Sequence, residues 1–170
     1  MDVGWVLPVC WLSLGVIVVG CSVGAGRSRR AAGLGIAAVA ALWVLAGAGA
    51  NLLFLVRGED FSGFADQAST SFVRDTWESL VVPHHAVFIG LLVAFEAAAG
   101  AAVLVAGRVR QIALVLLMAF NVALLSFGWG YLMWSVPLVA ALESLRRADR
   151  RHSVSVVDAL RPVAPARTAR

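Results

Sequence analysis

A single carboxylate lies in the middle of an apolar segment that is long enough to cross a membrane. The segment covers 84–107, reads HHAVFIGLLVAFEAAAGAAVLVAG, and has Glu96 near its centre. A charged side chain at that depth costs roughly 2.5–3.5 kcal/mol to insert, so it needs a proton, a polar partner or water. Glu96 is therefore either a neutral acid that bonds a neighbouring helix or a ligand- or proton-binding group. We favour the second interpretation, because intramembrane carboxylates are functional by default.

Four other polar side chains could share a site with this carboxylate: Asn51, Asn121, His84 and His85. A lone Asn in a membrane helix usually forms an interhelical hydrogen bond worth about 1 kcal/mol or less, and a ligand contact is the alternative. The histidines begin the same helix as Glu96 but lie about 16 Å along its axis from it, too far for a direct bond. We expect these residues to line an intramembrane pocket; unrelated packing contacts are the alternative.

Metal binding and the common catalytic arrangements find no support in the sequence. The only other histidine, His152, lies in the C-terminal tail, on the opposite side of the predicted membrane. We therefore predict no metal site. No residue has the spacing of a catalytic triad or a phosphate-binding loop. Acid–base catalysis by Glu96 would lack a second catalytic group, so the sequence does not assign an enzyme.

Composition describes a polytopic membrane protein rather than a soluble domain. Of 170 residues, 61% are hydrophobic and only 14% are charged. All 14 basic residues are arginines, which gives a net charge of +4 without implying nucleic acid, because they form short clusters between apolar runs. That distribution follows the positive-inside rule for membrane helices.

The apolar runs predict an all-α bundle of five transmembrane helices over 1–145, followed by a basic tail over 146–170. The predicted helices are 3–25, 31–56, 84–107, 111–127 and 131–145. We expect the first to remain a helix rather than to be cleaved as a signal peptide, because Asp2 and no Lys or Arg precede it. The last two divide one run at Gly128-Trp129-Gly130. Each is short for a full crossing, so a re-entrant pair is the alternative.

One long acidic loop, 57–82, joins the second and third predicted helices. It holds five acidic residues and two arginines, and its apolar residues recur at helical spacing. An amphipathic helix of this kind either lies on the membrane surface or covers a pocket in the bundle. Residues 129, 131 and 134 should form an aromatic belt at the same side.

Charge decides the predicted topology. Five helices with the N-terminus outside place all the arginine clusters and the C-terminus in the cytoplasm and leave the acidic loop outside. Four helices would export the arginines at the start of the tail. We therefore predict a multi-pass protein of the plasma membrane, with a tail that contacts anionic lipid and contains a short helix near 154–160. We predict the rest of the tail to be disordered.

The segment LLVAFEAAAGAAVLVAGRVRQIALVLL resembles the DoxX-like family of small bacterial membrane proteins. The matching positions are Glu96, Gly100, Gly107 and Arg108 or Arg110, within a resemblance over 31–145. It implies a four-helix core with a long first outside loop, to which the helix at 3–25 is an addition. It also implies association with quinol-linked redox systems or with membrane protein partners.

Two functions of different classes follow. The first is a binding module or accessory subunit of a membrane redox system that holds a quinone or lipid-like molecule near Glu96. The second is a small transporter or permease subunit in which Glu96 couples a proton or a substrate. An inverted repeat would favour transport, and the two halves of the sequence show none that is convincing.

Overall fold

The computed structural model describes residues 5–161, and every regular element among them is helical. The elements are α1 (Val6–Ala25), α2 (Arg29–Ala41), η1 (Leu42–Gly49), α3 (Ala50–Val56), α4 (Gly63–Asp66), α5 (Ser71–Thr76), η2 (Trp77–Val81), α6 (His85–Ala102), α7 (Arg108–Leu124), η3 (Leu125–Phe127), α8 (Trp129–His152) and α9 (Val156–Leu160). The all-α prediction is confirmed for this range. The predicted first helix begins at residue 3, and residues 3 and 4 lie outside the described range, as does the tail beyond 161.

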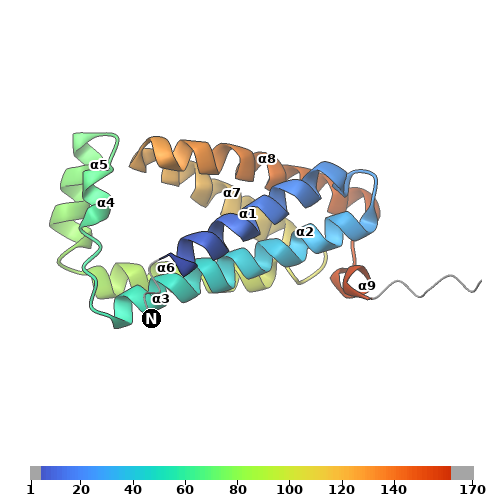
Figure 1. The fold of residues 1–170 in the computed structure, drawn as a ribbon, viewed down its shortest axis with the longest axis horizontal. Helices are drawn as coiled ribbons and strands as arrows, with labels where there is room; N and C mark the ends of the chain where they lie inside the picture. The colour runs from blue at the N-terminus through green and yellow to red at the C-terminus, as the bar shows by residue number, and fades with distance from the viewer. Residues whose placement is uncertain (1–4, 162–170) are drawn as a thin grey trace, which may run out of the picture.

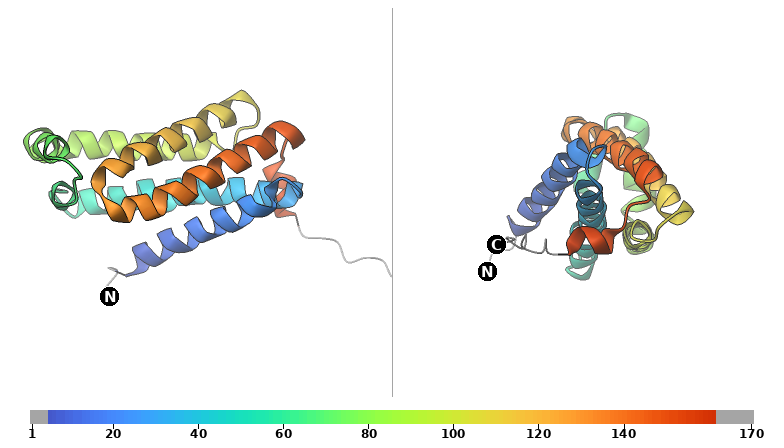
Figure 2. Two further views of the ribbon diagram at one scale, coloured as in Figure 1. Left: turned by 90° about the horizontal axis from the view of Figure 1, so that it is seen from above. Right: turned by 90° about the vertical axis from the view of Figure 1, so that its right-hand side faces the viewer.

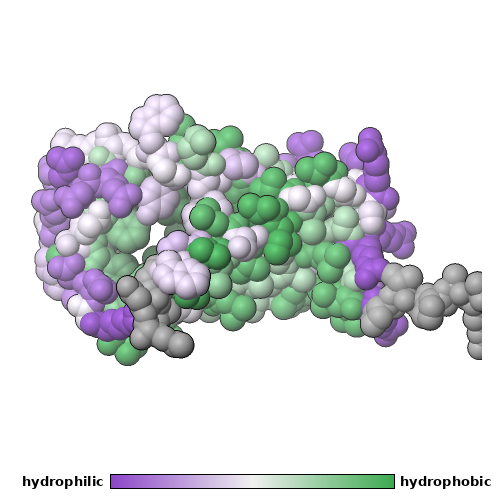
Figure 3. Space-filling view, viewed as in Figure 1, coloured by the Kyte–Doolittle hydropathy of each residue, from purple (hydrophilic) through white to green (hydrophobic). Residues whose placement is uncertain are grey.

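Four helices are long and apolar enough to cross a membrane. They are α1, the continuous helix formed by α2, η1 and α3, then α6, and α7 with η3. The chain is thus compatible with a multi-pass integral membrane protein. The surface agrees with this, since the face seen in Figure 3 is apolar along its middle and polar at both ends.

The fifth long helix, α8, runs along α7 and α1 but does not belong to those four. Its 24 residues span about 36 Å, so it is much longer than the predicted 131–145. Glu143 explains the extension, since it accepts hydrogen bonds from Arg146 and Arg147 one turn further on. Such i,i+3 and i,i+4 pairs stabilise a helix.

The two glycine-containing turns at the ends of α7 have the backbone expected of breaks between helices. Gly128 has φ 102°, a conformation that favours glycine, so the predicted division of the long run is correct. At the other end α6 stops at Ala102 rather than at 107, and Gly107 has φ 79°. The two predicted short helices form a hairpin of α7, which continues into η3, and the longer α8.

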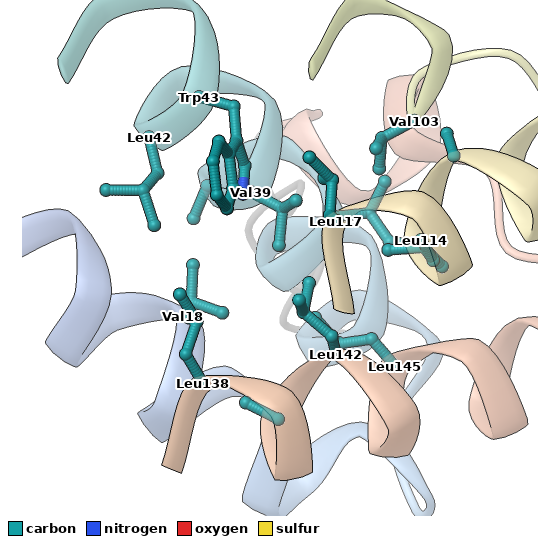
Figure 4. Packing of buried hydrophobic residues seen from close by; sticks show 14 of the residues in the cluster. Val18, Val39, Leu42, Trp43, Val103, Leu114, Leu117, Leu138, Leu142 and Leu145 are labelled. Atoms are coloured by element: carbon teal, nitrogen blue, oxygen red, sulfur yellow. The ribbon is translucent and has the colours of Figure 1, made fainter. Parts of the chain in front are cut away.

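The bundle core lies in the half of the molecule near the basic end. Here α1 packs in the angle between α2 and α8, and the α7–α8 hairpin packs beside it (Figure 2). Fully buried aliphatic side chains from four helices meet in one cluster, which includes Val18, Val39, Leu114, Leu142 and Leu145 (Figure 4). This core holds the helices together at that end of the bundle.

Arg110 is one of the most buried side chains of the described residues. It is 1% exposed and donates to Asp149 Oδ1 at 2.6 Å and to three backbone carbonyl oxygens, those of Val103, Leu104 and Val154. These acceptors belong to the end of α6 and to the end of α8 and its continuation. One guanidinium therefore ties three parts of the basic end together.

The predicted loop 57–82, which we call the cap, lies across the opposite end of the bundle (Figure 1). It is not one amphipathic helix, because it folds into the short helices α4, α5 and η2. The Ser69 N–H donates to the Ser126 carbonyl oxygen at 2.8 Å. Asp60 accepts a hydrogen bond from the Ser62 N–H at 2.9 Å, and this bond lowers the pKa of Asp60. The cap therefore lies over one end of the bundle, as expected if this segment covers a pocket.

Candidate functional site

Glu96 and Asn51 form the polar pair of the site. Asn51 Nδ2 on α3 donates to Glu96 Oε2 on α6 at 2.9 Å, and Glu96 is 4% exposed. Gly47 lies beside the carboxyl group, so close that a Cβ there would be 2.9 Å from Glu96 Oε1. The absence of a side chain at Gly47 therefore makes the space that the carboxyl group occupies.

This pair faces a cavity of about 550 Å³ in the cap half of the bundle. Glu96 lies at its deep end, eleven residues into α6, while Phe64 of α4 and Gln67, which follows α4, line its cap end. Leu7, Pro8 and Trp11 of α1 form a side wall. The volume is within the range of pockets that hold small organic ligands.

Aromatic side chains form much of the remaining wall. Trp134 stacks on Trp11 with ring centroids 3.4 Å apart, and Trp43 meets Phe120 edge to face at 5.2 Å. Tyr131 also lines the cavity. Residues 131 and 134 thus face the interior, instead of forming the aromatic belt that the sequence suggested.

Trp43 adds a hydrogen-bond donor that no protein group uses. It is 5% exposed, and its Nε1 has no hydrogen-bond partner among the described residues. A buried donor without a partner costs about 1–3 kcal/mol. Because this nitrogen is itself buried, it does not face the open space of the cavity.

The chemistry available is therefore hydrogen bonding inside an apolar enclosure. Glu96 can accept as a carboxylate or donate as an acid, and no salt bridge neutralises it within residues 5–161. Asn51 holds one carboxyl oxygen in place. In this part of the chain no group of three or more His, Cys, Asp or Glu side chains could hold a metal ion.

The other three predicted site residues lie away from this cavity. Asn121 is fully buried on α7, but its Nδ2 donates to the Leu117 carbonyl oxygen of its own helix at 2.8 Å. His84 precedes α6 and is exposed, while His85 Nδ1 lies 2.9 Å from the Val82 carbonyl oxygen. Of the five residues, the structure brings together only Glu96 and Asn51.

Sequence reasoning missed the aromatic lining and the role of the first helix. The signal for the aromatic lining was weak, because tryptophan near a membrane interface is also expected in an aromatic belt. Trp11 and Trp134 are far apart in the sequence, and only the packing of α1 against α8 brings them together. No family model, curated protein or solved structure matches this chain.

Proposed function

We propose that this protein is a membrane-embedded binding protein whose cavity holds the polar head of a quinone or lipid-like molecule at Glu96. The observation that carries the proposal is the Asn51–Glu96 pair at the deep end of an otherwise apolar, aromatic cavity. A few convergent polar groups in an apolar pocket are typical of small-molecule sites. The ring of a quinone suits the aromatic walls, and one of its carbonyl oxygens can accept a hydrogen bond from protonated Glu96.

We further propose that the protein is a member of the DoxX-like family and acts as an accessory subunit of a membrane redox system. Two of the residues that carry the resemblance have clear packing roles. Gly100 lets α6 approach η1, since a Cβ there would be 2.9 Å from a methyl group of Val44. Gly107 has the left-handed backbone that begins α7. These are local packing and turn roles. Membership of the family and a redox protein partner are part of the proposal.

The proposed topology has five crossings, with the N-terminus and the cap outside the plasma membrane and the C-terminus in the cytoplasm. The length of α8 and its packing along α7 support a fifth crossing. Reporters fused after residue 60 and after residue 150 should give opposite signals. Equal signals at the two sites would refute the five-crossing topology.

The binding proposal is tested by what the protein retains on purification in mild detergent. The organic extract of the wild type should contain an enriched quinone or isoprenoid, as measured by mass spectrometry. Glu96→Gln should lose it while expression stays near normal, because the amide keeps the shape but not the proton chemistry. Glu59→Gln, in the exposed part of the cap, is the matched control and should retain it.

Two outcomes would count against binding at Glu96. Extracts that contain only bulk phospholipid, identical in wild type and Glu96→Gln, would leave the cavity without a ligand. That result would move the assignment toward a transport or partner-binding subunit. An enriched molecule that Glu96→Gln retains in full would place its head elsewhere.

A further inference from the structure

The cap closes the axial path between the cavity and the outer aqueous phase. Phe64 of α4 and Gln67, which follows α4, line the cap end of the cavity. The Phe64 ring packs near Trp77, Phe127 and Tyr131, with centroids 5.4 to 6.4 Å away. Trp77 Nε1 in turn donates to the Phe61 carbonyl oxygen at 2.9 Å. This end of the cavity is therefore covered by interlocked aromatic rings.

The side of the bundle beside α1 is less tightly covered. The N-terminal half of α1 diverges from the other helices (Figure 2), and its outer face is apolar and exposed, with Val9 at 50% and Leu12 at 51%. Its inner face contributes Leu7, Pro8 and Trp11 to the cavity wall. Figure 3 shows a hollow in the molecular surface between the cap and this half of α1.

The size and polarity of the cavity fit an amphiphile that is only partly enclosed. A volume of about 550 Å³ accommodates a ring or another compact head. A long apolar chain exceeds that space and must leave it. The polar groups of Glu96 and Asn51 lie at the deep end, while the wall beside α1 is apolar and borders the region that lipid would occupy.

We infer that the ligand enters sideways from the bilayer, between the N-terminal half of α1 and the cap, with its head at Glu96 and its chain left in the lipid. This inference rests on the proposed function. It narrows the ligand class to membrane-dissolved amphiphiles with one hydrogen-bonding head and one apolar chain. It also makes the N-terminal half of α1, where Trp11 stacks on Trp134, the side wall of this route.

The path can be measured by cysteine labelling without any knowledge of the ligand. Ala50→Cys places a thiol in the cavity wall of a protein whose Cys10 and Cys21 have been replaced by serine. The protein is reconstituted in phosphatidylcholine vesicles and treated with N-dodecylmaleimide or with a maleimide that carries a sulfonate. Leu91→Cys, on the exposed face of α6, is the lipid-facing control, and Ser62→Cys, in the cap, is the water-facing control.

Sideways access predicts that Ala50→Cys behaves like Leu91→Cys. The dodecyl reagent, which concentrates in the bilayer, should label it about tenfold or more faster than the sulfonated one. Leu7→Trp, which adds bulk to the cavity side of α1, should slow this labelling severalfold. Val9→Trp, on the lipid side of the same helix, should not.

Three results would overturn the inference. The first is that Ala50→Cys is labelled mainly by the sulfonated reagent, as Ser62→Cys is. The second is that neither reagent labels Ala50→Cys. The third is that Leu7→Trp and Val9→Trp give equal labelling rates at Ala50→Cys. The extraction experiment with Glu96→Gln is independent of these rates. If labelling shows the sideways path but extraction finds no retained molecule, only the proposed ligand is refuted. If extraction finds a retained molecule but labelling does not show this path, only the route is refuted.

Discussion

Replacing Asp149 by leucine should be among the most destabilising single changes at the basic end of the bundle. Its side chain is 6% exposed and pairs with Arg110, whose side chain is 2% exposed. The second carboxylate oxygen accepts from Gln111 Nε2 at 2.6 Å. Asp149→Leu would leave a buried guanidinium bonded only to carbonyl oxygens. Gln111 Nε2 would keep only its longer bond to the Arg146 carbonyl oxygen, at 3.4 Å.

The expected loss of unfolding free energy is about 3–5 kcal/mol, the usual cost of removing one member of a buried ion pair. Arg110→Leu should cost a similar amount, because it also leaves the carbonyl oxygens of Val103, Leu104 and Val154 without this donor. The double variant removes both charges. It should therefore be more stable than the sum of the two losses predicts, by about 0.5–3 kcal/mol.

Unfolding by sodium dodecyl sulfate in mixed micelles, followed by far-ultraviolet circular dichroism, measures these differences. Arg147→Gln is the matched control, because Arg147 pairs with Glu143 while 67% exposed. An exposed pair of this kind is worth about 0–1 kcal/mol. A loss below about 1 kcal/mol for Asp149→Leu, or losses that simply add in the double variant, would refute the reasoning.

Two further pairs of glycine substitutions test the packing of α1 and the turn before α7. Gly15→Ala should destabilise by about 1–3 kcal/mol, since its Cβ overlaps the Trp134 ring, and should change tryptophan fluorescence, whereas Gly20→Ala meets no neighbour and should not. Gly107→Ala should cost about 1–3 kcal/mol because φ is 79° there, whereas Gly90→Ala, in open space on α6, should be neutral or stabilising. The same detergent unfolding measures the stability of all four variants. Equal losses for Gly15→Ala and Gly20→Ala would contradict the Trp134 contact, and equal effects for Gly107→Ala and Gly90→Ala would contradict the backbone argument at Gly107.

The helices themselves were predictable because each depends on its own stretch of sequence. A long apolar run forms a helix wherever backbone groups must bond internally, and Gly128 breaks the last run because of its backbone freedom. The ends were less accurate. α8 continues to His152 through a charged stretch, since ion pairs within the helix and the contact of Asp149 with Arg110 favour it. Hydropathy does not report such contacts.

The candidate site could be predicted only at its centre. Glu96 was identifiable because inserting a carboxylate within an apolar run costs free energy, so that it needs a polar partner. Asn51 was one of the polar side chains that could share a site with it. The same logic also selected Asn121, His84 and His85, which the structure places outside the cavity. A polar residue in an apolar segment must find a partner, but the sequence does not say whether that partner is a ligand, another helix or its own backbone.

The sequence by itself determined that the chain forms apolar helices of membrane-spanning length, because helix formation and hydrophobicity are local properties. It predicted five such helices, and the structure of residues 5–161 has four that are long and apolar enough to cross a membrane. Only the tertiary structure decided that Asn51 meets Glu96 across 45 positions of sequence and that Trp11 stacks on Trp134. It also decided that Arg110 is buried. These results depend on the rotation of each helix about its axis and on its distance from its neighbours. Both are set by the packing of the whole bundle, so no single segment encodes them.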